Sequence, residues 1–169
     1  NKLGEMIKIG RRGSLSGLIK ISGTQGHVAY PHLVNNPINT LIAICKKLKE
    51  NKLDQGNKNF QSSNLEFTSI NVDNEATNVI PATARAQFNI RFNNLHTSNS
   101  LKKKISKVVK SITRKNKCKF KIDFHVSGES FLTKPNNTIY IAKKIIKKIT
   151  KITPCLLYTS PSPRDKRQS

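Results

Sequence analysis

The sequence predicts an α+β fold in which two helices cover one face of a four-stranded antiparallel sheet. Four segments alternate apolar and polar residues with the two-residue period of a half-buried strand. Two other segments repeat apolar residues at the spacing of an amphipathic helix. Their order along the chain is strand, helix, strand, strand, helix, strand. This is the order of the ferredoxin-like βαββαβ two-layer sandwich.

The first strand and the first helix flank a turn-rich loop. Residues 14–22 place alternate residues on one side, namely Leu15, Gly17, Ile19 and Ile21. Residues 37–51 place apolar residues at helical spacing, on a face formed by Ile38, Leu41, Ile42, Cys45 and Leu48. Pro37 suits the first turn of this helix, because the N–H that proline lacks has no partner there. We therefore expect a strand followed by a surface helix.

The second and third strands follow this helix. Residues 64–72 alternate Leu65 and Phe67 and then shift phase to Ile70 and Val72, which is typical of a strand with a β-bulge. Residues 83–92 alternate without a shift. Their inward residues are Ala84, Ala86, Phe88, Ile90 and Phe92, and their outward residues are Arg85, Gln87, Asn89 and Arg91.

The second helix and the fourth strand complete the unit. Residues 98–115 predict a helix, with Ser98 or Ser100 as the N-cap and Lys on the outer face. Its apolar face is formed by Leu101, Ile105, Val108, Val109 and Ile112. Residues 117–126 predict a half-buried strand before Gly128, with Cys118, Phe120, Ile122, Phe124 and Val126 on its apolar side.

A third helix lies outside this unit. Residues 138–151 predict it, with Asn136 or Asn137 as its N-cap. Its apolar face is Ile139, Ala142, Ile146 and Ile149. We therefore expect a compact module over residues 13–128, inserted between residues 1–12 and 129–154 of a larger domain.

The two ends of the chain carry signals of their own. Asn1 rather than Met begins the chain, which indicates a piece of a longer protein. Residues 155–169 contain neither Ile nor Asn and resemble translated sequencing-adaptor read-through. We expect these residues to be a non-native tail, and a natural disordered tail rich in Ser and Pro is the alternative.

Composition bounds the class of protein. The net charge of +22 resembles that of a nucleic-acid binder, yet Lys, Asn and Ile make up 61 of the 169 residues. A/T-rich codons encode all three, so genome bias explains the charge without a basic groove. No apolar stretch approaches the roughly 18 residues of a membrane span, and no secretory signal is visible, so a cytoplasmic protein is expected. The three Cys are odd in number and far apart, which indicates plain thiols.

The sequence argues against several common classes of catalytic and cofactor site. The sequence contains no GxSxG, GxxxxGK[ST], GxGxxG or HExxH motif. A catalytic metal needs three or more converging ligands, whereas His27 and His32 lie in a loop with no Cys near them. We therefore expect no metal site within this chain. An RNA-binding sheet is a different-class alternative, but the third strand lacks the glycine of that signature and its aromatics share the core face.

Three loop segments carry candidate site residues. The segment GRRGS, residues 10–14, puts two Arg where a guanidinium could bind a carboxylate. The segment QGHVAYPH, residues 25–32, exposes His27 between a glycine and a proline. The segment TNVIP places Asn78 before the third strand, and Arg91 points outward near that strand's end. Together these cationic and amide donors suit an anionic substrate.

The segments GRRGSL, GTQGHVAYPHLVNNP, DQGN, NVIP, QFNIRF and SGESFLT occur in this order over about residues 7–154. In this they resemble the succinyl-diaminopimelate desuccinylases of the di-zinc aminoacylase and carboxypeptidase superfamily. The resemblance implies a zinc-bearing α/β catalytic domain with an inserted ferredoxin-like lid that forms the homodimer. The chain would be that lid together with the two segments, residues 1–12 and 129–154, that connect it to the catalytic domain. The two zinc ions, for which cobalt can substitute, and the catalytic glutamate would lie outside it, so the fragment alone is expected to be inactive.

The resemblance also implies a reaction and a role for six residues. The family hydrolyses N-succinyl-LL-2,6-diaminoheptanedioate to succinate and LL-2,6-diaminopimelate in lysine and diaminopimelate biosynthesis, through a zinc-bridging water. His27 matches the His that reaches into the partner's active site and stabilises the oxyanion. The matches to substrate-binding positions are Arg11, Ser14, Tyr30, Asn78 and Arg91. Acetylornithine deacetylases and dipeptidases of the same superfamily are the nearest alternatives.

Overall fold

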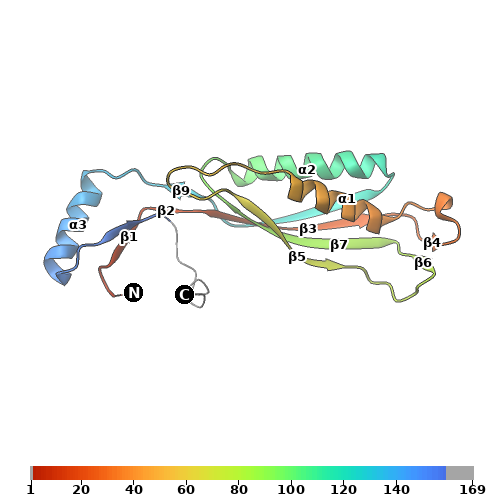
Figure 1. The fold of residues 1–169 in the computed structure, drawn as a ribbon, viewed down its shortest axis with the longest axis horizontal. Coiled ribbons are helices and arrows are strands. Elements are labelled where there is room, and N and C mark those ends of the chain that lie inside the picture. Colours follow the sequence, from red (N-terminus) through yellow and green to blue (C-terminus); the bar gives the residue numbers. More distant parts are fainter. Residues whose placement is uncertain (1, 159–169) are drawn as a thin grey trace.

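The structure, a computed structural model, describes residues 2–158 and contains a four-stranded antiparallel sheet with two helices on one face (Figure 1). The strand order is β5-β7-β3-β8. The strands are β3 (Gly13–Ser22), β5 (Asn64–Asn71), β7 (Thr83–Phe92) and β8 (Lys119–Gly128), and the helices are α1 (Pro37–Glu50) and α2 (Ser98–Lys115). The predicted α+β ferredoxin-like arrangement is confirmed.

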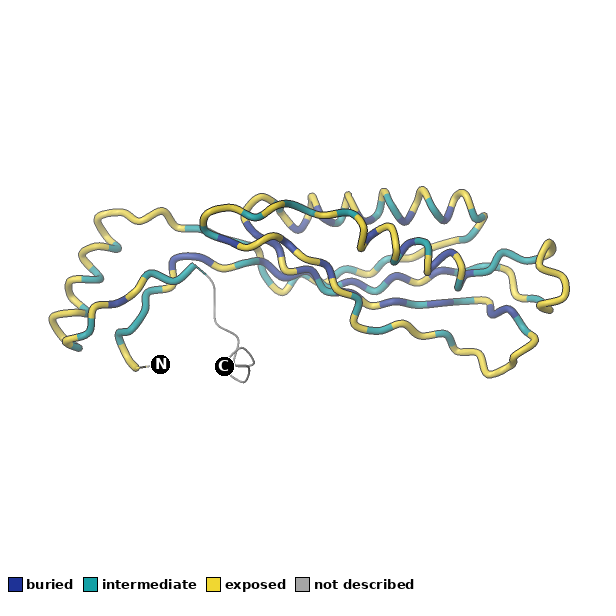
Figure 2. Tube along the Cα trace, in the orientation of Figure 1, coloured by how far each residue is buried: buried dark blue, intermediate teal, exposed yellow. Residues whose placement is uncertain are grey.

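The hydrophobic core lies between the sheet and the two helices (Figure 2). All five predicted inward residues of β7 are buried, as are Leu15, Ile19 and Ile21 of β3. The prediction for α1 was wrong at Ile42, which is 58% exposed, while Ile44 is fully buried. A helix turns about 100° per residue, so a buried stripe through Thr40, Leu41, Ile44 and Leu48 leaves Ile42 on the helix flank.

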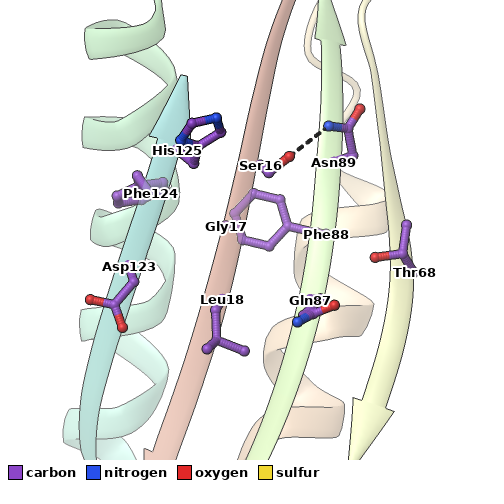
Figure 3. Close-up of a pocket in the computed structure, with 10 residues that line it drawn as sticks. All are labelled: Ser16, Gly17, Leu18, Thr68, Gln87, Phe88, Asn89, Asp123, Phe124 and His125. Atoms are coloured by element: carbon purple, nitrogen blue, oxygen red, sulfur yellow. Dashed lines mark hydrogen bonds between the residues drawn. The ribbon is translucent and has the colours of Figure 1, made fainter. Parts of the chain in front are cut away.

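Two phenylalanine rings pack over glycines of the neighbouring strand. Gly17 pairs with Phe88 and Gly13 pairs with Phe92. In each pair the ring occupies the space that a Cβ on the glycine would need. Figure 3 shows the Phe88 ring beside Gly17. Glycine at these positions therefore lets a large aromatic ring close the core against the backbone of β3.

Side-chain caps fix where helices α1 and α2 begin. Thr97, and not the predicted Ser98 or Ser100, caps α2, because its side chain accepts from the Ser100 N–H while the Ser100 hydroxyl accepts from the Thr97 N–H. Ser98 is buried in the first turn instead. Asn36 caps α1 ahead of Pro37.

The predicted bulge of β5 is present. The register against β7 shifts between Phe67 and Ser69. Beyond the bulge Ile70 is 59% exposed, because β5 is an edge strand and no strand among residues 2–158 pairs with its outer side. Leu65, before the bulge, is buried in the core.

Within the described residues, three separate two-stranded sheets and helix α3 lie beyond the ends of the four-stranded sheet (Figure 1). None of these short strands was predicted, since two or three residues carry no readable period. At one end of the elongated molecule lie β1, β10 and α3, and at the other lie β4 and β6 (Figure 1). The bounds are β1 (Met6–Lys8), β2 (Gly10–Arg11), β4 (Gly26–His27), a 3-10 turn (Pro31–Leu33), β6 (Val79–Ile80), β9 (Phe131–Leu132), α3 (Asn137–Thr150) and β10 (Cys155–Leu157).

These elements pair two by two. Strand β1 pairs with β10 in parallel, β2 pairs with β9, and β4 pairs with β6. Helix α3 is capped by Asn136, one of the two predicted caps. The expected tail begins at Cys155, which lies in β10, and residues 159–169 of that tail lie outside the described residues.

Candidate functional site

Three of the predicted substrate-binding residues meet at the end of the sheet near β2 and β9; we call them the base group. Ser14, at the start of β3, is 7% exposed and pairs with Arg91 of β7 on one side and Gly128 of β8 on the other. The guanidinium of Arg11 lies over Gly128 and leaves no room for a Cβ there. Two cations and a hydroxyl therefore share one corner of the sheet, a combination suited to carboxylates.

Asn89 orders the hydroxyl of this group. Its Nδ2 donates to Ser14 Oγ at 3.3 Å and to Ser16 Oγ at 2.9 Å, the second bond being drawn in Figure 3. Sequence reasoning predicted only that Asn89 points outward. Its position two residues before Arg91, on the same strand face, is the signal that could have linked it to the base group.

The other three predicted residues meet at the opposite end of the molecule; we call them the tip group. His27 lies on β4 opposite Val79 of β6, and the Val28 N–H donates to the Asn78 carbonyl at 3.0 Å. A turn follows, in which the Tyr30 N–H donates to the His27 carbonyl at 3.0 Å. The rings of Tyr30 and His27 lie 6.1 Å apart between centroids. The His27 and Asn78 loops are thus joined into one exposed unit.

The hydrogen bonding of His27 fixes which ring nitrogen is a donor. The backbone N–H of Ala29 donates to His27 Nδ1 at 3.1 Å. A nitrogen that accepts an N–H carries no hydrogen of its own, so the neutral imidazole is protonated at Nε2. Because His27 is exposed, its Nε2–H is free to donate to a group outside this chain's own fold.

The two groups are far apart. Ser14 is the second residue of β3 and Ser22 is its last. A strand rises about 3.3 Å per residue, so these two residues lie roughly 26 Å apart. The tip group lies beyond Ser22, on β4 and on the loop before β6 (Figure 1). A small molecule held by the base group therefore cannot reach the tip group of the same chain.

A hollow of about 470 Å³ lies on the sheet face that the helices leave open (Figure 3). Ser16, Leu18, Gln87, Asn89 and His125 are among its lining residues. None of the six predicted site residues lines it. Phe88 of β7 is among the lining residues, but it is only 1% exposed and belongs to the hydrophobic core, as does Phe92. The exposed aromatic platform of a single-strand RNA binder is thus missing from β7.

Metal ligands do not converge in the part of the chain that the structure describes. Across residues 2–158 no three His, Cys, Asp or Glu side chains come close enough to hold a metal ion. A metal centre does not fit these residues. Within the same residues no helix is long and apolar enough to cross a membrane.

The cysteines are free thiols, as predicted. Burial raises the pKa of Cys45 to about 11, against a smaller opposing effect of its backbone hydrogen bond. The Cys45 thiol therefore stays protonated at neutral pH and is a poor nucleophile.

A buried carboxylate in the DQGN segment fastens a loop to the core. Asp54 accepts from the Gly56 N–H at 2.6 Å and from Asn93 Nδ2 at 2.8 Å, and the Ser63 N–H also donates to it. His96 Nε2 lies 3.1 Å from Asp54 Oδ2, without the alignment of a hydrogen bond. Burial raises the pKa of Asp54, but the hydrogen bonds from Ser63, Gly56 and Asn93 lower it more, to about 2. The DQGN motif alone does not predict this structural role, which depends on contacts with residues farther along the chain.

Comparison with known proteins places this geometry in a family. Residues 9–117 match the M20 peptidase dimerisation domain. The chain is 60% identical over 159 residues to the succinyl-diaminopimelate desuccinylase of Pelagibacter ubique, covering 94% of this chain and 41% of that protein. It is 47% identical over 158 residues to the succinyl-diaminopimelate desuccinylase of Parvibaculum lavamentivorans, covering 94% of this chain and 40% of that protein. The chain thus spans about two fifths of the length of these curated relatives.

Solved structures support the fold. Aminopeptidase PepT of Bacillus cereus matches with a TM-score of 0.74 at 13% identity, over 94% of this chain and 41% of that one. An aminohydrolase described as putative, from Staphylococcus aureus, matches with a TM-score of 0.75 at 16% identity, over 91% of this chain and 39% of that one. The resemblance to the desuccinylases that the motifs indicated is confirmed by the curated relatives. The chain therefore belongs to the M20 peptidase dimerisation domain family.

Proposed function

We propose that this chain is the lid and dimerisation region of a cytoplasmic succinyl-diaminopimelate desuccinylase. That enzyme hydrolyses N-succinyl-LL-2,6-diaminoheptanedioate to succinate and LL-2,6-diaminopimelate. Residues 13–128 form the lid, and residues 1–12 and 129–154 connect it to the catalytic domain. The 60% identity to a desuccinylase supports the activity. The two zinc ions are bound by the rest of the longer protein, where cobalt can replace them.

One observation carries the role of this region: the base group and the tip group lie at opposite ends of the same sheet. The substrate is much shorter than the roughly 26 Å between Ser14 and Ser22 of β3. If both groups contact one substrate molecule, they come from different subunits. The tip group of one subunit then completes the site at the base of its partner.

The chemistry of the tip group suits amide hydrolysis. Attack on the amide carbonyl places negative charge on the carbonyl oxygen, and a preorganised N–H donor stabilises that charge. His27 offers Nε2–H for this task, since the Ala29 N–H occupies Nδ1. Asn78 and Tyr30 lie beside His27 and contact the substrate from the same side.

The longer protein that contains this chain tests the activity directly. Loaded with zinc, it is expected to release succinate from N-succinyl-LL-2,6-diaminoheptanedioate much faster than it cleaves N-acetylornithine or a dipeptide. Preferred cleavage of N-acetylornithine or of a dipeptide would instead identify one of the related enzymes of the superfamily. RNA binding without any hydrolysis would overturn the proposal.

The base group is expected to bind substrate carboxylates. Arg11→Ala and Arg91→Ala should each raise KM about 10- to 100-fold and change kcat less, because a charge-assisted hydrogen bond contributes about 1.5 to 3 kcal/mol to ground-state binding. Steady-state kinetics of the full-length protein measures this effect. Lys121→Ala, which removes an exposed cation of β8 that pairs with Asp123, should leave KM unchanged. Loss of folding in the Arg variants would favour a structural role.

The second subunit is expected to pair with the β5 edge of the sheet. An edge strand has unpaired backbone groups, and β5 also carries the exposed Ile70, while α1 above it exposes Ile42. The opposite edge, β8, exposes Lys119 and Lys121, charges of the kind that discourage pairing. Antiparallel pairing of two β5 strands reverses the strand direction. It therefore places the tip of each subunit towards the base end of the other.

Ile70→Lys should convert the full-length dimer to monomer and remove most activity, because it buries an unpaired cation in the pairing edge. Sedimentation velocity measures the oligomeric state. Lys121→Glu, on the β8 edge, should remain dimeric. A monomeric Lys121→Glu protein beside a dimeric Ile70→Lys protein would assign the interface to β8.

A further inference from the structure

We infer that Asn74 is a positioning residue that holds the tip group in its working arrangement. The inference rests on the proposed function of His27 and Asn78. Asn74 lies in the loop between β5 and β6, four residues before Asn78. Its side chain touches none of the six site residues in the contacts that the structure gives it, and it acts through the backbone.

The amide of Asn74 closes the loop that carries Asn78. Its Nδ2 donates to the Ala76 carbonyl at 3.1 Å and to the Val79 carbonyl at 3.0 Å. These two carbonyls lie on either side of Asn78 in the sequence. One side chain thus links both flanks of the Asn78 position, and the Asn74 N–H adds a bond to the Val72 carbonyl at 3.0 Å.

The same contacts extend to His27 through β6. Val79 pairs with His27, Ile80 pairs with Gly26, and the Val28 N–H donates to the Asn78 carbonyl. A two-residue strand has few hydrogen bonds of its own. The Asn74 side-chain amide donates to the carbonyl of Val79, the β6 residue opposite His27. It thus replaces a hydrogen bond that a neighbouring strand would supply. Loss of that amide should therefore loosen both the Asn78 loop and the His27 strand.

An acid at this position tests the inference with little change in shape. Asn74→Asp replaces the donor NH₂ with a carboxylate oxygen that faces two carbonyl oxygens. In the full-length protein kcat/KM should fall roughly tenfold, the effect of losing one or two ordinary hydrogen bonds. Glu75→Gln changes the neighbouring exposed residue of the same loop and should stay within about twofold of the wild type.

Amide hydrogen exchange measures the β4–β6 pairing independently of activity. Amide hydrogen exchange at Val28 should become faster in Asn74→Asp and stay unchanged in Glu75→Gln, because the Val28 N–H bonds the Asn78 carbonyl. Exchange in the core strands β3 and β7 should not change. Wild-type exchange at Val28 in Asn74→Asp would overturn the inference.

Combined variants separate positioning from general folding. In a protein already carrying His27→Ala and Asn78→Ala, adding Asn74→Asp should lower kcat/KM less than about twofold further, because the groups it positions are gone. A repeated tenfold loss would show a general structural role and overturn the inference. Full activity of His27→Ala alone would instead contradict the proposed function, while the Val28 exchange result would still decide whether Asn74 orders the tip.

Discussion

His27→Ala in the full-length protein is expected to lower kcat by about 100- to 1000-fold while leaving the metal content unchanged. A preorganised donor to an oxyanion contributes about 3 to 4 kcal/mol to transition-state stabilisation. His27 meets the structural conditions for such a donor. Its Nδ1 accepts from the Ala29 N–H, its ring is exposed at the end of the molecule, and its strand is bonded to β6.

A conservative variant distinguishes donation from packing. His27→Gln places an amide N–H near the position of Nε2, so its kcat should lie between those of the wild type and of His27→Ala. His32→Ala, five residues along the same loop, keeps the tip group and should retain most activity. Wild-type turnover in His27→Ala would refute the oxyanion role.

Mixed dimers test whether His27 acts in the partner's site. One subunit carries His27→Ala, and the other carries an intact tip but a metal centre disabled by a substitution outside this chain. Each homodimer should be nearly inactive, whereas the heterodimer has one complete site and should recover up to half of the wild-type activity per dimer. No recovery would mean that His27 serves its own subunit, contrary to the separation of the two groups.

The arrangement of the sheet and its helices could be predicted from the sequence because burial imposes a period on each element. Strand β7 shows this most clearly, since its inward and outward residues alternate without a break. The period of α1 was misassigned at Ile42, because in a helix rich in Ile and Leu several adjacent stripes look equally apolar. Strands β4 and β6 could not be predicted, since two residues cannot show a period and their pairing depends on tertiary contacts.

The candidate site residues could be selected from the sequence, but their arrangement in space could not. Motif resemblance selected all six residues, but nothing in their order shows that Ser14 and Arg91 are cross-strand neighbours while His27 lies at the far end. That division depends on the register of β3 against β7, which follows from side-chain packing across the whole sheet. The proposed role of Asn74 could not be predicted, because it rests on two hydrogen bonds to backbone carbonyls and an Asn in a loop is ordinary.

Asp54→Asn is expected to lower the free energy of unfolding by about 2 to 3 kcal/mol at neutral pH. The Asp54 side chain is 8% exposed and accepts from Gly56, Ser63 and Asn93. An asparagine of the same shape presents an NH₂ group to donors that it cannot satisfy, and it carries no charge for them to stabilise. Urea unfolding, followed by circular dichroism, measures the change.

The effect should depend on pH in a direction fixed by the pKa of Asp54. The hydrogen bonds lower that pKa to about 2 from 3.8, so the native state stabilises the ionised form. This contribution, of about 2 kcal/mol, is fully present above roughly pH 4 to 5 and is lost as the pH falls through about 2. The wild type and Asp54→Asn should therefore converge in stability as the pH approaches 2.

Asp123→Asn provides the matched control, because its carboxylate is 57% exposed and pairs only with the exposed Lys121 among the ion pairs of the described residues. An exposed ion pair contributes about 0 to 1 kcal/mol, so this variant should show little loss and little dependence on pH between 2 and 7. Two results would contradict this prediction: equal losses of unfolding free energy in the two variants, or a stability difference between Asp54→Asn and the wild type that persists at pH 2. Either result would mean that net charge sets the acid sensitivity of this fold, and not the hydrogen-bonded Asp54 carboxylate.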